Sequence, residues 1–218
     1  MSYVREHSYG KTYLTTQKFT DIITIMSAFS RFSVPSLEEL PEDIRSRIAE
    51  VTERSGFTPN VLMALARRPD EFRAFFAYRD AIMDRGDGLT KAEREMIVVA
   101  TSATVNCTYC LLSHGSSLRI LTKDPYLSDQ LTMNYRAAPL TKRHRAMLDY
   151  AVKLSLHPQE ISDDDQEVLR ELGFDDEDIW DISSVVAFFA LSNRMVHAMA
   201  LKPNSEFFNL GRFSGEGA

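Results

Sequence analysis

Two segments of this 218-residue chain resemble each other at a spacing of 51 positions. The segments LTKAEREMIVVA (89–100) and LTKRHRAMLDYA (140–151) share six of twelve residues, and LRIL (118–121) matches LREL (169–172) at the same offset. Self-similarity at one spacing, without a gap, indicates a duplicated supersecondary unit. Both copies keep a cap signal and the same apolar spacing, which is what a helix needs. The sequence therefore predicts two diverged helix pairs, at about 89–122 and 140–173.

Helix start and stop signals continue along the rest of the chain. Capping boxes are predicted at Ser36 with Glu39 and at Thr90 with Glu93, and Gly56 is expected to end a helix. Further starts are expected at Thr58-Pro59, Ser162 and Asp175, and a further stop at Gly86. No Asn-Gly hairpin turn and no sustained period-two alternation interrupts this pattern. We predict an all-α fold, a multi-helix bundle.

Composition narrows the class of protein. Hydrophobic residues make up 44% and charged residues 26%, as in ordinary globular proteins, and the net charge is -6. This acidic balance argues against nucleic acid as a partner, and no run reaches the roughly 18–20 apolar residues of a membrane span. The N-terminal residues contain no apolar signal region, so we expect a cytoplasmic protein. We predict an N-terminal extension (1–32), one helical domain (33–203) and a C-terminal tail (204–218).

Positions at which the two repeat units differ are candidates for a functional role, because the positions that they share are enough to form the helices. Four positions of the first unit carry reactive side chains where the second unit has Ala146, Pro158, Ile161 and Asp165. These four residues are Glu95, Cys107, Cys110 and His114. The shared positions serve the fold, so we interpret the unshared carboxylate, thiols and imidazole as candidate site residues.

Three of the four candidates fall on one helix face. At about 100° per residue, Cys107, Cys110 and His114 lie within a sector of roughly 60°. Asn106 is expected to be the N-cap, which would place the CxxC motif in the first turn, where the helix dipole favours a thiolate. Glu93 is expected to be occupied by the capping box. That leaves Glu95 as the free carboxylate, at the start of a helix where partial burial would suit proton transfer.

Three readings of the two cysteines, the only ones in the chain, were compared. A zinc site could use C-x2-C-x3-H with Glu95 as a fourth ligand, but structural zinc sites usually draw on a second knuckle, which is missing here. Two inert core cysteines would explain neither the CxxC spacing nor the in-phase histidine. Redox chemistry explains both, and it is the interpretation we favour, with no metal and no bound cofactor.

The pattern E-x11-C-x2-C-x3-H on two consecutive predicted helices resembles the alkylhydroperoxidase D-like family of the carboxymuconolactone decarboxylase superfamily. The segments TPNVLMALARRPDEFRAFFAYRDAIM, CTYCLLSHG and LSNRMVHAMALKPNSEFFNLGR are similar to its peroxidase-related branch, over about residues 33–212. The resemblance implies an alkylhydroperoxidase D-like bundle and an oxidoreductase. Tyr109 stands where the characterised hydroperoxidases often carry a second histidine.

The resemblance also implies a role for each candidate. Cys110 would attack a peroxide, Cys107 would resolve the product into a disulfide, and His114 with Glu95 would relay protons. It implies a small-molecule hydroperoxide as substrate, an external dithiol reductant (a lipoyl group or a thioredoxin-like protein) and a homo-oligomer. In generic CxxC helices, by contrast, the first cysteine is usually the one with the low pKa.

The predicted function is therefore a CxxC-dependent hydroperoxidase acting on organic hydroperoxides, with an antioxidant role. One alternative is a decarboxylase-like enzyme acting on a lactone, a chemistry that does not need two thiols. The other is a non-catalytic redox sensor switched by a disulfide between Cys107 and Cys110.

Overall fold

The structure is a computed structural model that describes residues 29–212. The described part is all-α, as predicted, and contains no strand. Its α-helices are α2 (Glu42–Ser55), α3 (Asn60–Leu65), α4 (Pro69–Met83), α5 (Lys91–Thr104), α6 (Thr108–Thr122), α7 (Leu127–Asn134), α8 (Lys142–Leu156), α9 (Asp163–Glu171) and α10 (Asp176–Met199). Short 3-10 turns are η1 (Leu37–Glu39), η2 (Tyr135–Ala137), η3 (Pro158–Glu160) and η4 (Ser205–Phe208).

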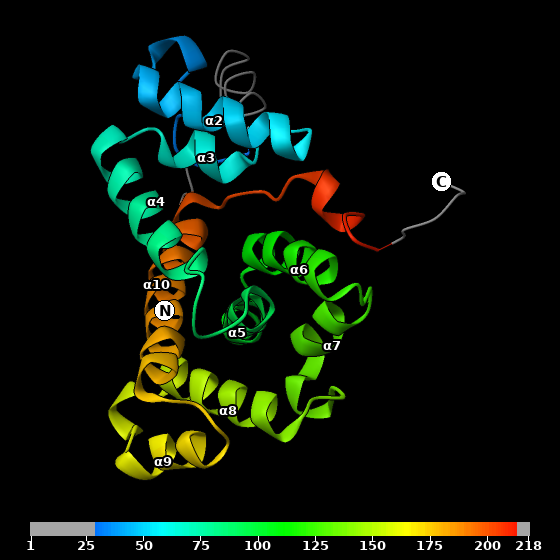
Figure 1. The fold of residues 1–218 in the computed structure, drawn as a ribbon. Helices are drawn as coiled ribbons and strands as arrows, with labels where there is room; N and C mark the ends of the chain where they lie inside the picture. The colour runs from blue at the N-terminus through cyan, green and yellow to red at the C-terminus, as the bar shows by residue number, and fades with distance from the viewer. Residues whose placement is uncertain (1–28, 213–218) are drawn as a thin grey trace, which may run out of the picture.

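Helix α5 is the centre of the fold. Figure 1 shows it end-on, with α6, α7, α8 and α10 arranged around it. Ten consecutive residues of α5, from Glu93 to Ser102, are buried. A helix that is surrounded by other helices needs apolar side chains on every side. In α5 the run MIVVA supplies them. The charged residues at its start must therefore find partners inside the protein.

Arg94 is one of these charged residues and has no exposed surface. Its guanidinium donates to Asp181 Oδ2 on α10 at 2.6 Å, to the carbonyl of Asp87 at 3.0 Å and to the carbonyl of Leu89. Arg145, the equivalent residue 51 positions later, donates to the carbonyl of Ala138 at 2.9 Å. Asp87 and Ala138 are also 51 positions apart. Each repeat unit thus has an arginine that donates to the backbone carbonyl seven residues before it, as well as the same helix start. We call this interaction the arginine clamp.

The helix caps agree with most of the predicted starts and stops. Thr90 with Glu93, Ser162 with Asp165 and Asp175 with Asp178 form capping boxes, and Gly56 ends α2 in the left-handed conformation at φ 80°. Thr58 was expected to be the N-cap of α3 and Pro59 its first residue, but Pro59 is the N-cap, one residue later. The predicted stop at Gly86 was also wrong, because α4 ends at Met83. Helix α7 was not predicted, although Asp124 before it accepts hydrogen bonds from the N–H groups of Tyr126 and Leu127 at 2.8 and 3.2 Å.

Helix α10 is long and apolar enough to cross a membrane by length and composition alone. Its most apolar window is, however, 56% buried inside the protein. It packs against α4, α5, α8 and α9. These contacts are those of a core helix, and its buried apolar residues include Val185, Val186, Phe188 and Phe189.

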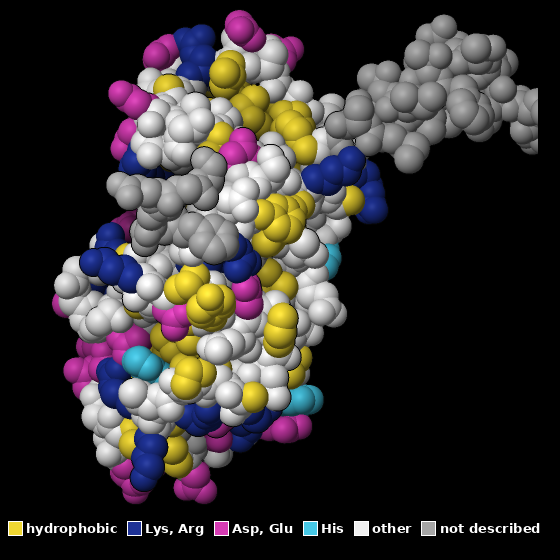
Figure 2. All heavy atoms as spheres, turned by 90° about the vertical axis from the view of Figure 1, so that its right-hand side faces the viewer, with side chains coloured by type: hydrophobic (Ala, Val, Ile, Leu, Met, Phe, Trp, Pro, Cys, Tyr) yellow, Lys and Arg dark blue, Asp and Glu magenta, His cyan; other side chains and the backbone are white. Residues whose placement is uncertain are grey.

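Figure 2 shows the face on the side of α6 and α7. Hydrophobic side chains on this face lie in small groups separated by charged ones. Exposed members on α6, α7 and the segment between them include Ile120, Tyr126 and Met133. The predicted extension 1–32 lies mostly outside the described residues, as does the end of the predicted tail 204–218.

The two arginine clamps provide a test of the fold. Arg94→Ala removes the main partner of a buried carboxylate, so we expect a loss of about 3 kcal/mol in the free energy of unfolding. Arg145→Ala is the matched control, since Arg145 donates to carbonyls only and is half-buried. Its loss should be about 1 kcal/mol. Urea denaturation measures both, and equal losses would contradict the role given to the pair Arg94–Asp181.

Candidate functional site: a dithiol beside a Glu–His pair

The two cysteines lie at the junction between α5 and α6. Helix α5 ends in a Schellman motif, in which the N–H of Asn106 bonds the carbonyl of Ala103 at 3.2 Å and the N–H of Cys107 bonds that of Ser102 at 3.1 Å. Asn106 has φ 53°, a left-handed conformation that Asn adopts more readily than most residues. The prediction that Asn106 caps α6 was wrong. Cys107 is the N-cap, so CxxC does occupy the first turn.

The junction brings the two thiols together. The sulfur atoms of Cys107 and Cys110 lie 2.8 Å apart and are not bonded. A hydrogen bond from the Cys110 thiol lowers the pKa of Cys107, and this effect exceeds the opposing effect of burial. The same hydrogen bond, followed by burial, raises the pKa of Cys110. The shared hydrogen bond therefore makes Cys107 the more acidic thiol of the pair.

Glu95 and His114 form a pair across the interface of α5 and α6. Glu95 Oε2 lies 2.7 Å from His114 Nδ1, and the Glu95 side chain is only 8% exposed. A carboxylate at Nδ1 holds the imidazole proton on that nitrogen and leaves Nε2 free to accept one. The ring of His114 also packs edge-on against Phe189 of α10, with centroids 4.7 Å apart. The imidazole is thus fixed in both position and tautomer.

Cys110 and His114 line the same small cavity, of about 120 Å³. Its walls are mainly aromatic and aliphatic, and the other polar groups on it are Tyr109, Arg79 and Ser192. Cys107 has no exposed surface and does not line this cavity. Of the two sulfurs, Cys110 is therefore the one that a small molecule in the cavity would meet.

Ser192 is a site residue that the sequence did not reveal. It lies on α10, 82 positions after Cys110, and no motif joins the two. A hydrogen bond from the Ser192 hydroxyl to the Cys110 sulfur lowers the pKa of Cys110, in opposition to burial and Cys107. Ser192 therefore favours formation of a thiolate at the sulfur that faces the cavity.

Tyr109, between the cysteines, holds the neighbouring helix. Its hydroxyl accepts a hydrogen bond from the backbone N–H of Val61 in α3 at 3.1 Å. Its ring packs edge-on against Phe207 of η4, with centroids 5.9 Å apart. The segment around Phe207 is in turn tied to α6 by the buried Arg119, which donates to the carbonyls of Phe207 and Leu210 at 2.8 and 2.9 Å. Phe207 of this C-terminal segment shares one buried apolar cluster with Cys107 and Cys110.

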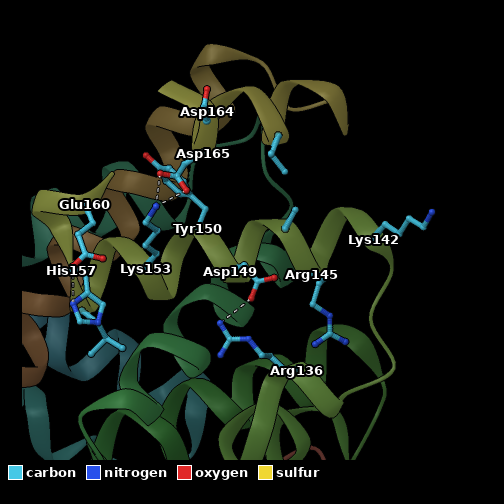
Figure 3. A pocket seen from close by; sticks show the side chains of 13 residues that line it. Arg136, Lys142, Arg145, Asp149, Tyr150, Lys153, His157, Glu160, Asp164 and Asp165 are labelled. Atoms are coloured by element: carbon cyan, nitrogen blue, oxygen red, sulfur yellow. Dashed lines mark hydrogen bonds and ion pairs between the residues drawn. The ribbon is translucent and has the colours of Figure 1, made fainter. Parts of the chain in front are cut away.

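A larger hollow, of about 770 Å³, lies between α8 and α9 in the second repeat unit. Figure 3 shows its charged lining, in which Lys153 pairs with Asp165 and Arg136 with Asp149. The second unit has no thiol, so this hollow lacks the chemistry of the first. No group of three or more His, Cys, Asp or Glu side chains within residues 29–212 is arranged to hold a metal ion. The ligands of the disfavoured zinc alternative, Cys107, Cys110, His114 and Glu95, are among the residues searched and form no such group.

The fold and the site together define an all-α protein with a reduced dithiol and a buried Glu–His pair beside an apolar cavity. Residues 69–121 match the model of the carboxymuconolactone decarboxylase family. A search of the curated proteins found no significant match.

Two solved structures are similar over most of their length. The first is the alkylhydroperoxidase AhpD core of an uncharacterized peroxidase-related protein from Ralstonia eutropha JMP134, at 54% identity and TM-score 0.85. It covers 86% of this chain, and this chain covers 99% of it. The second is an uncharacterized peroxidase-related protein from Silicibacter sp. TM1040, at 42% identity and TM-score 0.81, with coverages of 84% and 96%. This chain therefore belongs to the AhpD-like family of the carboxymuconolactone decarboxylase superfamily.

A more distant similarity concerns the fold alone. The debrominase Bmp8 is 18% identical, with TM-score 0.65 and coverages of 84% of this chain and 95% of that chain.

The electrostatics of the dithiol predict a two-step titration. One thiolate should form below the ordinary thiol range, on Cys107, and the second only at much higher pH. Cys107→Ser removes the neighbouring thiolate, so the pKa of Cys110 should fall below the second step of the wild type. Ser192→Ala removes a donor to the Cys110 thiolate and should raise its pKa. Thiolate absorbance in the ultraviolet against pH measures each change, and an unchanged Cys110 titration in both variants would contradict the assignment.

Proposed function

We propose that the protein is a CxxC-dependent hydroperoxidase that reduces organic hydroperoxides at Cys110. The observation that carries this proposal is that Cys110 and His114 line one small cavity, while Glu95 holds the imidazole at 2.7 Å from behind. A thiol, a base and a group that orients the base are the components of an activated nucleophile. The membership of the AhpD-like family and the peroxidase-related proteins at 54% and 42% identity support the same reaction class.

The first step takes place at Cys110. Its thiol gives a proton to His114 Nε2, and the resulting thiolate attacks the terminal oxygen of the hydroperoxide. The S–O bond forms as the O–O bond breaks, and the imidazolium returns its proton to the leaving alkoxide, which departs as an alcohol. Cys110 is now a sulfenic acid. Ser192 contributes to this step by stabilising the thiolate.

The second step uses Cys107. The hydrogen bond from Cys110 lowers the pKa of Cys107, which favours its thiolate, and its sulfur already lies 2.8 Å from that of Cys110. The Cys107 thiolate attacks the sulfenic sulfur, the S–S bond forms, and the S–O bond breaks with release of hydroxide, which takes a proton to become water. The dithiol and one hydroperoxide thus give a disulfide, an alcohol and water.

The two cysteines differ in acidity and in access to the cavity, and these two properties favour different residues as the attacking thiolate. The charge favours Cys107 as the thiolate, which fits the generic CxxC expectation. Only Cys110 lines the cavity, however, and a peroxide must approach the attacking sulfur. Cys110 is therefore assigned to attack and Cys107 to resolution. A dithiol reductant, either a lipoyl group or a thioredoxin-like protein, returns the pair to the reduced state by thiol–disulfide exchange.

Substitutions at the four residues should give distinct kinetic results. Cys110→Ser should abolish peroxide consumption, whereas Cys107→Ser should still react once and stop at the sulfenic acid. His114→Asn should lower kcat roughly 10²-fold, since a general base typically contributes this much. In Glu95→Gln the amide oxygen can still accept a hydrogen bond from His114 Nδ1, so kcat should fall less than in His114→Asn. Peroxide consumption with dihydrolipoamide or thioredoxin measures all four, and mass spectrometry identifies the sulfenic acid.

The same assay separates the enzyme from a redox sensor. An enzyme consumes many equivalents of peroxide while reductant lasts, whereas a sensor is oxidised once per chain. Continued turnover by Cys110→Ser with an intact fold would contradict the proposal. Single oxidation of the wild type in the presence of every reductant would favour the sensor.

A further inference from the structure

The cavity at Cys110 is too small to hold the whole of a large substrate. Its volume of about 120 Å³ corresponds to about four water molecules at ~30 Å³ each. A hydroperoxide group with a few carbons would fill it. Any longer organic hydroperoxide must therefore extend beyond this cavity.

An apolar groove continues from the cavity. It lies between α4 and α10, has a volume of about 440 Å³, and its apolar lining includes Leu65, Phe75, Tyr78, Phe188, Leu191 and Met195. We call this the acyl groove. Phe75 and Phe188 line both the cavity and the groove, and their rings are in contact with centroids 4.7 Å apart. Figure 1 shows α4 and α10 next to each other at the left of the molecule.

The charged residue that lines the groove is Glu71, which also lines the next hollow along the surface. Leu65 and Met195 also line a hollow of about 280 Å³ that includes Arg67 and Arg68. Arg68 pairs with Glu71 at 2.5 Å, so its charge is largely compensated. Arg67 donates to the oxygens of Ser33 and lies over the ring of Phe32, and no carboxylate lies within ion-pair distance of it among residues 29–212. Its positive charge is available to an anion.

The cavity, the groove and Arg67 follow one another in the same order as the reactive group, apolar chain and charged end of an amphipathic ligand. A thiol cavity is followed by an apolar groove and then by a guanidinium that has no carboxylate partner among residues 29–212, with shared walls at each transition. Apolar lining with one polar group that fixes orientation is the usual design of a small-molecule site. Building on the proposed function, we propose that the substrate is a long-chain hydroperoxide bearing a carboxylate, with its chain in the acyl groove and its carboxylate at Arg67.

The rings of Phe75 and Phe188 then have a specific role. They stand between the thiol cavity and the groove and admit the chain by changing rotamer, and the hydroperoxide carbon passes between them. Small peroxides need only the thiol cavity, so their reduction does not depend on the groove. This difference makes the two parts of the site separable by experiment.

The test compares four peroxides: hydrogen peroxide, tert-butyl hydroperoxide, the hydroperoxide of linoleic acid and the methyl ester of that hydroperoxide. We expect the acid to have the highest kcat/KM. Leu191→Lys places a charge in the groove and should lower kcat/KM for the two long-chain substrates roughly tenfold or more, with the small peroxides unchanged. Leu156→Lys is the control, because Leu156 is similarly exposed (46% against 51%) and lies at the end of α8, away from the groove.

Arg67→Gln should raise KM for the acid roughly tenfold and leave the methyl ester unchanged, because only the acid carries the charge. Arg194→Gln is its control, since Arg194 is exposed on α10 and donates only to the carbonyl of Ala190. Calorimetric titration with myristate, which cannot react, gives a readout without turnover. We expect binding by the wild type and its loss in Leu191→Lys.

The outcomes distinguish this inference from the proposed function. Reduction of small peroxides without preference for the acid, and without myristate binding, would overturn the inference and leave the hydroperoxidase standing. Myristate binding without turnover of any peroxide would support the groove and contradict the hydroperoxidase. If Leu191→Lys lowers all activities equally and changes the sedimentation coefficient, the groove is an interface between copies and the inference is wrong.

Discussion

The burial of α5 is the constraint on which the rest of this structure depends. Because the helix is surrounded by other helices, three successive charged residues at its start must each find a partner in a different direction. Glu93 pairs with Arg143 of α8, Arg94 with Asp181 of α10, and Glu95 with His114 of α6. Successive helical residues point about 100° apart, so the three pairs attach α5 to three neighbours. Two of these pairs serve the fold, and the third contains the imidazole of the candidate site.

The features that sequence alone predicted are those with local causes. Thr90 with Glu93 marks a helix start because both partners lie within one turn, and the same logic assigned Glu93 to the cap and left Glu95 free. The internal comparison separated Glu95, Cys107, Cys110 and His114 from residues shared for packing. Helix α7 was missed, and in the structure it packs against α5 and α6. Ser192 was missed because only tertiary structure brings it to Cys110.

The error at Asn106 has a physical explanation. Asn is favoured both as an N-cap and in the left-handed position that ends a helix, so the residue type alone does not decide between them. The decision depends on where α5 ends, and its Schellman motif places Asn106 after α5 rather than before α6. The consequence concerns chemistry. Cys107 becomes the N-cap and Cys110 the third residue of the helix, which brings the two sulfurs to 2.8 Å.

The site combines a rigid side and an adaptable side. Glu95, His114 and the dithiol lie on α5 and α6, where Glu95 and His114 are joined by a hydrogen bond. Phe207 of the C-terminal segment, whose carbonyl is bound by Arg119, belongs to the same buried cluster as Cys107. The opposite wall consists of Phe75, Phe188 and Phe189, whose fit depends on ring packing rather than on hydrogen bonds. Catalytic geometry demands fixed donors and acceptors, whereas an apolar ligand requires only a wall of suitable shape. In the proposed function, the thiols, the base and its carboxylate therefore lie on α5 and α6, whereas the proposed contacts with the substrate chain lie on α4 and α10.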